Sequence, residues 1–419
     1  MPVTLAEKII AAHAQVDAVV PGQIVVADVD VAIAQDGTGP LAIEQIRELG
    51  GGVAAPVVVF FIDHTAPAPR SELANAQATI RAFCRESGAT LSDIEMGVCH
   101  QRVAESYAKP GDLIIGADSH TCTAGGLGAF ATGMGSTDVA VGMTSGKTWL
   151  RVPETFRVEV SGSFAPGVSA KDLMLTLIGL LGADGATYKA LEFGGSAVAA
   201  LPAHERLTLA NMAVEAGAKA GLFASDEVTK GFLREMGRES DWRPLAADAG
   251  AAYERTIAFD TGAIVPMVAA PHTVDNVFAA ADKAGTRVDQ VSIGTCTNGR
   301  LEDLRAAAAI LAGRRRAPHT RLIVTPASRA IGRAAAREGL LEVFIDAGAA
   351  VTNPGCGSCF GVHQGILADG EVCVSTANRN FKGRMGNPAA FIYLASPATA
   401  AASAVAGEIV DPRQLLPAP

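Results

Sequence analysis

The first 150 residues alternate short apolar segments with amphipathic ones, and this alternation constrains the fold more than any other feature. Three segments, at 23–33, 55–64 and 112–120, have the composition of buried strands, whereas segment 71–88 has the periodicity of a helix. Strands that alternate with helices indicate an α/β fold. Polar residues follow these strands, at the edge where sites gather in such sheets.

Two changes of pattern divide the rest of the chain. Pro153 precedes an alternating segment, which indicates a second unit that runs to about residue 265 and contains an amphipathic helix over 205–219. A strand-helix-strand-helix-strand run follows at 289–359 and predicts another parallel sheet. We therefore predict three α/β units, which a chain of 419 residues can accommodate, with the limits 1–153, 154–265 and 266–419.

Composition and charge exclude several classes of protein. With 49% hydrophobic and 18% charged residues, the chain is typical of a compact enzyme rather than a disordered protein. The longest apolar stretch, 53–62, is far shorter than the roughly 20 residues of a membrane span, and no signal-peptide core is evident. We expect a cytoplasmic protein with no membrane partner. The net charge of −9 argues against nucleic acid as a partner.

The cysteines point to metal or redox chemistry. Their odd number disfavours a disulfide framework in a chain of this kind. Cys356 and Cys359 form a CxxC pattern in a loop of glycine and proline, and Cys296 follows an earlier strand of the same predicted sheet. Because the carboxyl ends of parallel strands lie at one edge of a sheet, the three thiols could meet there. The seven cysteines are residues 84, 99, 122, 296, 356, 359 and 373.

Three interpretations of these cysteines are open. A redox pair is disfavoured, because a redox CxxC usually opens a helix early in its fold. A zinc site would need a fourth ligand, for which His363 and Cys373 are the candidates near the loop. Three cysteines without a fourth suit a four-iron four-sulfur cluster with one iron free to bind substrate oxygen.

A second group of reactive side chains follows predicted strands. Segment 116–140 is rich in glycine but matches neither GxGxxG nor GxxxxGK[ST], so phosphate binding is unsupported. An acid there could orient an imidazole while a hydroxyl contacts substrate. Three histidines at strand ends, two with an aspartate nearby, favour a shared polar site over unrelated side chains. The residues in question are Asp63, His64, His100, Asp118, Ser119 and His120.

Two further patterns lie later in the chain. Asn211 and Glu215 are four residues apart on the predicted helix and therefore share a face. The alternative is that this face is an ordinary polar stripe exposed to solvent. Arg379 and Arg384 stand beside Asn378 in the segment STANRNFKGR. Because guanidinium groups bind carboxylates through two parallel hydrogen bonds, the two arginines suit a di- or tricarboxylic acid.

In this order the motifs resemble those of the aconitase superfamily, specifically the large subunits of the 3-isopropylmalate dehydratase and homoaconitase group. The resemblance covers nearly the whole chain. It implies three α/β domains around a central iron–sulfur cluster, with the swivelling fourth domain of single-chain aconitases absent and supplied as a separate subunit. The motifs that carry it are FIDH, GVCHQ, GADSHTCTAGGLGAFATGMGSTD, NMAVEAGA, SIGTCTNGRLEDL, CGSC and STANRNFKGR.

The resemblance also implies a role for each site residue. Cys296, Cys356 and Cys359 would hold a 4Fe-4S cluster whose fourth iron lacks a protein ligand and takes substrate. Asn211 and Asn378 match residues close to that cluster. The residues that match the acid-base and orienting network are Asp63, His64, His100, Asp118, His120 and Glu215. Those that match substrate contacts are Gln35, Ser119, Arg379 and Arg384.

The expected reaction is the dehydration and rehydration of a 2-hydroxy di- or tricarboxylic acid. The base of single-chain aconitases is a serine of the swivelling domain, in a motif not found in this sequence, so the resemblance implies a small subunit as partner. Conversion of 2-isopropylmalate to 3-isopropylmalate in leucine biosynthesis is favoured. Gln35 and Ser358 depart from the pattern of many isopropylmalate members, which leaves homoaconitate, dimethylmalate, citramalate and citrate open.

Two other classes of function compete with a hydro-lyase. A cluster-dependent regulator that binds RNA is disfavoured by the acidic charge and by the acid-base histidines. A zinc-stabilised structural protein would leave the strand-end histidines unexplained, as well as Arg379 and Arg384. The identity of the bound metal separates that alternative from an iron–sulfur enzyme.

Overall fold

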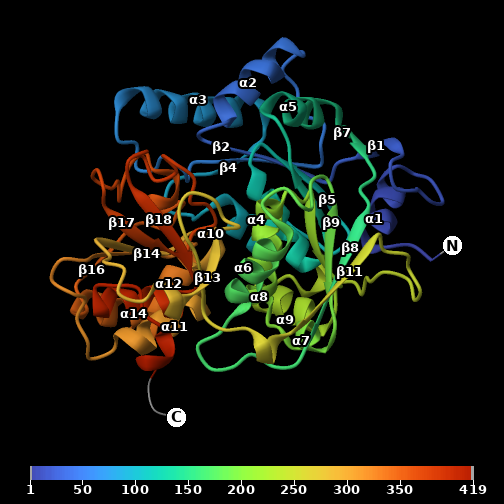
Figure 1. The fold of residues 1–419 in the computed structure, drawn as a ribbon. Helices are drawn as coiled ribbons and strands as arrows, with labels where there is room; N and C mark the ends of the chain where they lie inside the picture. The colour runs from blue at the N-terminus through green and yellow to red at the C-terminus, as the bar shows by residue number, and fades with distance from the viewer. Residues whose placement is uncertain (1, 417–419) are drawn as a thin grey trace.

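The computed structural model describes residues 2–416, which form four β-sheets covered by helices. Figure 1 shows the amino-terminal part in blue and teal at the top, the middle part in green at the centre and right, and the carboxyl-terminal part in orange and red at the left. The three parts meet near the centre of the molecule. Within residues 2–416, no helix has the length and apolar character that a membrane crossing requires.

The first part contains a five-stranded sheet of order β4-β3-β2-β5-β6, in which all strands are parallel. The segment at 23–33 is two strands rather than one, because β1 pairs with β7 in a separate antiparallel ribbon. The elements are α1 (Leu5–His13), β1 (Ile24–Asp28), β2 (Val31–Gln35), α2 (Gly39–Glu48), β3 (Val57–Phe61), α3 (Ser71–Ser87), β4 (Thr90–Ser92), α4 (Cys99–Ser106), β5 (Leu113–Gly116), η1 (Ser119–Leu127), β6 (Phe130–Gly133), α5 (Ser136–Ser145) and β7 (Lys147–Arg151).

The second part is a four-stranded parallel sheet of order β10-β9-β8-β11. The helix expected over 205–219 is shorter, because it tightens into a 3₁₀ turn after Met212 and ends at Gly217, whose φ is 86°. The elements are β8 (Thr155–Ser161), α6 (Ala170–Leu181), β9 (Ala190–Gly194), α7 (Ser196–Ala200), α8 (Ala203–Met212), η2 (Ala213–Ala216), β10 (Ala220–Phe223), α9 (Glu227–Glu235), η3 (Glu239–Asp241), β11 (Arg255–Asp260) and η4 (Thr261–Ala263).

The third part is a seven-stranded sheet of order β13-β12-β18-β17-β14-β15-β16. The five strands from β18 to β16 are parallel, as the strand-helix run predicted, and β12 joins β18 antiparallel. The elements are β12 (Met267–Ala269), β13 (Val277–Ala279), η5 (Ala280–Lys283), β14 (Gln290–Gly294), α10 (Thr295–Asn298), α11 (Leu301–Leu311), β15 (Arg321–Thr325), α12 (Arg329–Arg337), α13 (Leu340–Asp346), β16 (Ala349–Val351), η6 (Gly357–Phe360), β17 (Val372–Ser375), β18 (Phe391–Ala395), α14 (Pro397–Ala406) and η7 (Pro412–Gln414).

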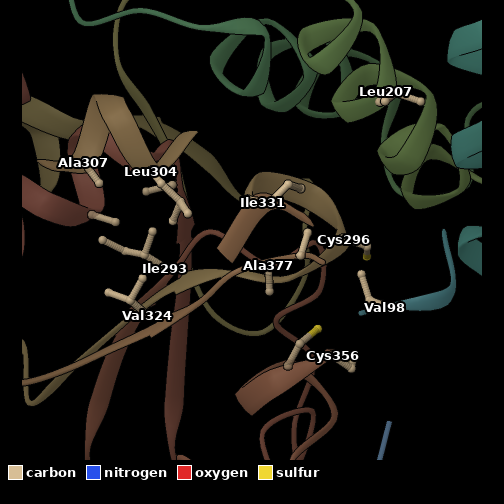
Figure 2. Close-up of a cluster of buried hydrophobic side chains, with 14 of the residues drawn as sticks. Val98, Leu207, Ile293, Cys296, Leu304, Ala307, Val324, Ile331, Cys356 and Ala377 are labelled. Atoms are coloured by element: carbon tan, nitrogen blue, oxygen red, sulfur yellow. The ribbon is translucent and has the colours of Figure 1, made fainter. Parts of the chain in front are cut away.

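One buried cluster joins all three parts. Val98 before α4, Leu207 on α8 and Ile293 on β14 are fully buried in it, and Cys296 lies at its edge (Figure 2). Burial of each large aliphatic side chain stabilises the fold by about 1.5–3 kcal/mol, so this shared core holds the three parts against one another. Each large sheet draws its strands from one predicted unit, and we keep 153 and 265 as the proposed domain limits.

The glycines of segment 116–140 allow close packing between the first and second parts. A Cβ on Gly125 would lie 1.8 Å from the carbonyl oxygen of Gly221, and one on Gly126 would lie 2.9 Å from the amide nitrogen of Leu207. Segment η1 therefore lies directly against α8 and β10. These glycines are needed for the approach of two backbones.

Candidate active site

The site forms where the carboxyl ends of the first and third sheets meet. Gln35 ends β2, Asp63 and His64 follow β3, and Asp118 follows β5, all at one edge of the first sheet. The N–H of Cys356, in the loop after β16, donates to the carbonyl of Asp63 at 3.0 Å. The cysteine loop of the third sheet is thereby joined to the histidine-bearing edge of the first.

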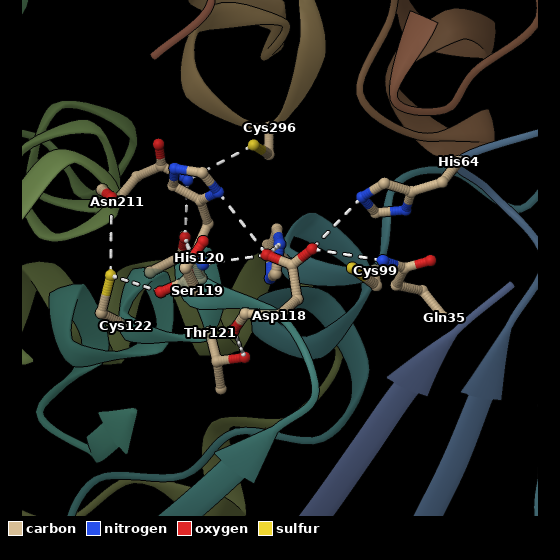
Figure 3. Close-up of polar contacts among 12 residues, drawn as sticks. Gln35, His64, Cys99, Asp118, Ser119, His120, Thr121, Cys122, Asn211 and Cys296 are labelled. Atoms are coloured by element: carbon tan, nitrogen blue, oxygen red, sulfur yellow. Dashed lines mark hydrogen bonds and ion pairs between the residues drawn. The ribbon is translucent and has the colours of Figure 1, made fainter. Parts of the chain in front are cut away.

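Asp118 is the centre of the polar network (Figure 3). Its Oδ1 accepts from His100 Nε2 at 2.9 Å and from the His120 amide at 2.9 Å, and its Oδ2 lies 3.4 Å from His64 Nε2. The amide nitrogen of Gln35 lies 3.5 Å from the same Oδ2. Burial alone would raise the pKa of Asp118, but the contacts with His100 and the other imidazoles hold that pKa well below its usual value.

The Asp63–His64 pair is buried and oriented. His64 Nδ1 lies 2.9 Å from Asp63 Oδ1, while Asp63 Oδ2 accepts the N–H of Cys99 at 2.6 Å. Burial would lower the pKa of His64, but the negative charge of Asp63 and the contact with Asp118 raise it well above its usual value. The charges around His64 therefore favour its protonated form, and its Nε2 faces Asp118 Oδ2.

Asp36 supports this pair and was missed by the sequence analysis. Its carboxylate accepts the backbone N–H of His64 at 2.8 Å and that of Thr65 at 3.1 Å, and Gln77 donates to it at 3.1 Å. Asp36 is buried and directly follows Gln35. Its position after a strand was the available signal, because the other acidic site residues occupy the same kind of position.

His120 connects the network to a third carboxylate. His120 Nε2 lies 2.7 Å from Glu215 Oε1, and Arg379 Nε donates to both oxygens of Glu215 at 2.9 and 3.1 Å. Burial would raise the pKa of Glu215, but the hydrogen bond from His120 and the charge of Arg379 lower it. Glu215 is therefore an anion that holds both His120 and Arg379, and the alternative of a solvated stripe on this helix is wrong.

The three predicted ligand cysteines are buried and surrounded by donors. Asn211 Nδ2 lies 3.4 Å from Cys296 Sγ, and Asn378 Nδ2 lies 3.6 Å from the same sulfur. Arg384 Nη2 lies 3.2 Å from Cys359 Sγ. A hydrogen bond from Cys356 and the guanidinium of Arg384 hold the pKa of Cys359 well below its usual value. N–H groups and a guanidinium directed at sulfur suit anionic thiolate ligands.

Cys296, Cys356 and Cys359 do not bring their three sulfurs within the reach of a single ion. Ligands of one zinc ion bound at about 2.3 Å lie roughly 4 Å apart. Among the described residues, two groups of potential ligand atoms lie within 4.8 Å of one another, and neither contains Cys296, Cys356 or Cys359. One group is Asp63, His64 and Cys99, and the other is His100, Asp118 and His120. The carboxylates of both groups already accept hydrogen bonds from imidazole or backbone N–H groups.

Neither candidate for a fourth protein ligand joins the cysteines. Cys373 lies in β17, opposite Gln290 in the strand register, and burial raises the pKa of its thiol to about 12. His363 belongs to neither group of close ligand atoms, and burial lowers the pKa of its imidazole. Ser358, between the two loop cysteines, is buried with its hydroxyl 2.5 Å from that of Ser292. The Ser358 side chain therefore packs on the sheet.

Arg300 is a second group that the sequence analysis missed. It is buried, and its Nη2 and Nη1 donate to the carbonyls of Cys296 and Thr297, both at 2.8 Å. Its Nε donates to Gln101 on α4 at 3.0 Å, and Nη1 reaches Thr208 on α8 at 3.1 Å. Arg300 therefore ties the turn that carries Cys296 to the first and second parts. No local pattern distinguishes it from a helix-capping arginine.

The remaining predicted residues lie around the same centre. Ser119 begins η1 and is half-buried, and it lines a cavity of about 520 Å³ that Lys219 and Asp138 also line. Arg379 and Arg384 are both half-buried. The structure thus brings together the residues predicted for the cluster, the acid-base network and the substrate, from all three parts of the chain, whereas His363 and Cys373 do not join them.

Comparisons with known proteins identify the family to which the chain is similar. The chain matches the Aconitase family (aconitate hydratase) over residues 7–286 and 279–407. It is 58% identical over 418 residues to the 3-isopropylmalate dehydratase large subunit of Elusimicrobium minutum, covering 99% of this chain and 100% of that one. It is 59% identical over 414 residues to the 3-isopropylmalate dehydratase large subunit 2 of Archaeoglobus fulgidus, covering 99% of each.

Two further matches point to the same family. The chain is 51% identical over 393 residues to the probable methanogen homoaconitase large subunit of Methanosarcina mazei, covering 93% of this chain and 100% of that one. The crystal structure of holo aconitase X from Thermococcus kodakaraensis shares the fold, with a TM-score of 0.52, 14% identity and 91% of both chains covered. The chain therefore belongs to the aconitase family and has the three-domain α/β fold of its large subunits. Membership implies a 4Fe-4S cluster.

Proposed function

We propose that this chain is the cluster-bearing large subunit of a hydro-lyase that converts 2-isopropylmalate and 3-isopropylmalate into each other. The observation that carries the proposal is the meeting of two groups at one edge. Three imidazoles surround Asp118, and beside them lie three buried cysteines with N–H donors directed at sulfur. Dehydration of a hydroxy acid needs both an acid for the departing hydroxyl and a site that binds oxygen.

His64 is the proposed general acid. Asp63 holds its Nδ1, and the charge of Asp63 together with the contact to Asp118 raises the pKa of His64, which favours the protonated imidazole. Its Nε2 has only a long contact of 3.4 Å, to Asp118 Oδ2. A proton on that nitrogen can therefore pass to a substrate hydroxyl within hydrogen-bond reach of Nε2. Asp118 stabilises the protonated imidazole of His64 before the transfer.

The other residues orient substrate and hold the cluster. Cys296, Cys356 and Cys359 would hold it, and when bound it would supply Lewis acidity at an iron that lacks a protein ligand. Asn211 and Asn378 donate to Cys296, which favours its thiolate. Ser119, Arg379 and Arg384 are the proposed carboxylate contacts, together with Gln35. Glu215 keeps the Arg379 guanidinium in place.

A small subunit completes the proposed enzyme. The relatives that match over their full length are named large subunits, which supports a partner chain. The resemblance to single-chain aconitases assigns the base to that partner. This base removes the proton from the carbon next to the one that carries the hydroxyl. The names of the relatives favour isopropylmalate as substrate, and homoaconitate is the second candidate because of the similarity to the Methanosarcina mazei protein.

Metal analysis is the first test of this proposal. Anaerobically purified chain should contain iron and acid-labile sulfide in nearly equal amounts. Brief exposure to air should remove one iron preferentially, and ferrous iron should restore it. With a small subunit from a close relative added, 2-isopropylmalate should be consumed faster than homocitrate, dimethylmalate, citramalate or citrate. Zinc without sulfide after attempted reconstitution would refute the proposed cluster. Faster consumption of homocitrate than of 2-isopropylmalate would show that the protein is a homoaconitase subunit instead.

A further inference from the structure

Lys171 is a fully buried lysine near the cysteines. It lies in the first turn of α6 and is 0% exposed. Its Nζ donates to the carbonyl of Thr376 at 2.9 Å and to that of Ala377 at 2.6 Å. Burying an ammonium group without partners is very costly, so these two hydrogen bonds are what allows a lysine here.

The two carbonyls belong to the segment that carries site residues. Asn378, which donates to Cys296, and Arg379, which donates to Glu215, follow Thr376 and Ala377 directly. The segment leaves β17, in the third sheet, whereas Lys171 comes from the second part of the chain. Lys171 therefore joins α6 to the backbone just before both side chains.

The neighbouring hydrogen bonds do not involve the two carbonyls that Lys171 binds. Thr376 Oγ1 accepts from the Gly294 amide at 2.9 Å, and Asn380 Nδ2 donates to the carbonyl of Ala270 at 2.9 Å. The Thr376 amide donates to the Ser292 carbonyl at 3.0 Å, and the Ala377 amide donates to Ser375 Oγ at 3.1 Å. These contacts hold the hydroxyl and the amides, whereas Lys171 Nζ holds the two carbonyls, where a small rotation would move Asn378 and Arg379 together.

The electrostatic surroundings of Lys171 are anionic. The groups that favour its charged form are Asp303, Asp172, Cys359 and Cys296, in that order. Burial opposes them and lowers the pKa of Lys171 to about 7. Negative charge on the two cysteine sulfurs therefore stabilises the charged form of Lys171. By reciprocity, the charge on Lys171 stabilises negative charge on those sulfurs.

We propose that Lys171 is a positioning residue. Its ammonium fixes the Thr376–Ala377 backbone so that Asn378 reaches Cys296 and Arg379 reaches Glu215, and it places a positive charge behind the cluster cysteines. The proposal rests on the proposed function only for its turnover measurement. Its other two consequences, a fixed segment and a shifted cluster potential, concern this chain alone.

Two variants separate the hydrogen bonds from the charge. Lys171→Met removes both, whereas Lys171→Gln removes the charge but keeps N–H groups that can reach a carbonyl. Lys8→Met is the matched control, since Lys8 pairs with Asp248 at the surface, away from the site. Three measurements apply to each variant: hydrogen exchange of peptides covering 375–384 in the metal-free chain, the midpoint potential of the reconstituted cluster, and kcat and KM with the small subunit.

Each measurement has an expected result. Lys171→Met should accelerate exchange in 375–384 by about tenfold or more, because two buried carbonyls lose their donors. Its KM should rise by about tenfold, with a smaller change in kcat, because Arg379 loses its position for substrate carboxylate. Lys171→Gln should retain most of the protection and affinity. Both variants should shift the cluster potential to more negative values, since a positive charge that favours reduction is lost.

Unchanged exchange and unchanged potential in both variants would overturn the proposal, and so would identical changes in Lys8→Met. If Lys171→Met fails to fold, Lys171→Gln decides alone through its potential: a value equal to that of the unmodified chain refutes the assigned role of the charge. Failure of the proposed function gives a different pattern. The unmodified chain with small subunit would then convert none of the acids, whereas the exchange and potential measurements would still distinguish the variants.

Discussion

At the scale of single residues, Asp118 gathers His64, His100 and His120 around one half-buried carboxylate, and Asp63 and Glu215 hold His64 and His120 from the other side. Every buried charge of the network has a partner of opposite sign, which is the condition under which burial is tolerated. The pKa shifts have consequences that can be measured. Removing one partner should shift a pKa in a known direction.

Asp63→Asn should move the alkaline limb of the kcat profile to lower pH. The charge of Asp63 raises the pKa of His64, and a general acid loses activity as pH rises through its pKa. Loss of that charge lowers the pKa, so activity fails earlier as pH rises. The measurement is kcat against pH for the chain with its small subunit. Asp248→Asn, at the surface, is the control, and an alkaline limb that stays in place would remove His64 as the acid.

Cys296→Ala should abolish cluster retention. Cys296 is one of three proposed ligands, and two remaining thiolates cannot hold a cluster with one iron already lacking a protein ligand. Iron and sulfide per chain after anaerobic reconstitution are the quantities to measure. Cys84→Ala is the matched control, since Cys84 is buried on α3 and contacts none of the site residues described above. A Cys296→Ala chain with full iron and sulfide would disprove the ligand assignment.

Arg384→Lys should raise KM by about tenfold or more, because a point charge cannot reproduce two parallel N–H bonds to a carboxylate. The contact between Arg384 Nη2 and Cys359 Sγ adds a second expectation, a cluster that loses iron faster in air. Steady-state kinetics and the rate of iron loss test the two effects separately. Arg413→Lys, at a surface ion pair with Asp411, should change neither. An unchanged KM would rule out a carboxylate contact for Arg384.

At the scale of secondary-structure elements, the turns that follow strands position the reactive groups. Gly294 ends β14 with a φ of 136°, and Cys296 follows two residues later. A Cβ on Gly294 would lie 2.0 Å from the carbonyl oxygen of Thr325 on the neighbouring strand. The turn that delivers Cys296 can therefore form only with glycine at this position.

Gly294→Ala should lower the free energy of unfolding of the metal-free chain by about 2 kcal/mol or more. Gly285→Ala is the control, because Gly285 also has a positive φ of 83° but the methyl group of an alanine there would meet no other part of the chain within 4 Å. That control should cost only about 1 kcal/mol, the cost of the backbone conformation itself. Thermal or denaturant unfolding measures both. Equal losses would mean that the approach to Thr325 imposes no added strain.

At the scale of the whole molecule, the site exists because three sheets meet. Arg300 contacts α4, α8 and the Cys296 turn, and Lys171 joins α6 to the segment after β17. Most of the reactive groups are buried at this junction, whereas Asp118, Ser119 and Arg379 remain partly exposed and can be reached by a further subunit. This arrangement agrees with the large-subunit names of the relatives.

The isolated chain, loaded with its cluster, should show no sustained isomerase turnover. Added small subunit should restore turnover in a saturable manner, because the proposed base comes from that partner. The measurement is the rate of 3-isopropylmalate formation against small-subunit concentration. Full turnover without the partner would show that this chain carries its own base. A rise with unrelated protein at the same concentration would show that the effect is not specific.

The sequence by itself determined the α/β class and the five parallel strands of the third sheet, and it supplied the candidates for the reactive side chains. These are local properties, since strand and helix periods and the residues after a strand lie within a few positions of one another. Segment 23–33 shows the limit of local pattern: two strands of different sheets have the same composition as one. The tightening of the helix at Met212 was likewise not expressed in its apolar period.

Only the tertiary structure decided which distant residues support the site. Asp36, Arg300 and Lys171 each have the local pattern of an ordinary strand end, helix cap or helix start. Their roles depend on contacts such as the one from Lys171 to Thr376, 205 residues away in sequence. Burial is the physical reason: a charge is retained inside a protein only where the fold brings a partner to it, and that partner comes from another part of the chain.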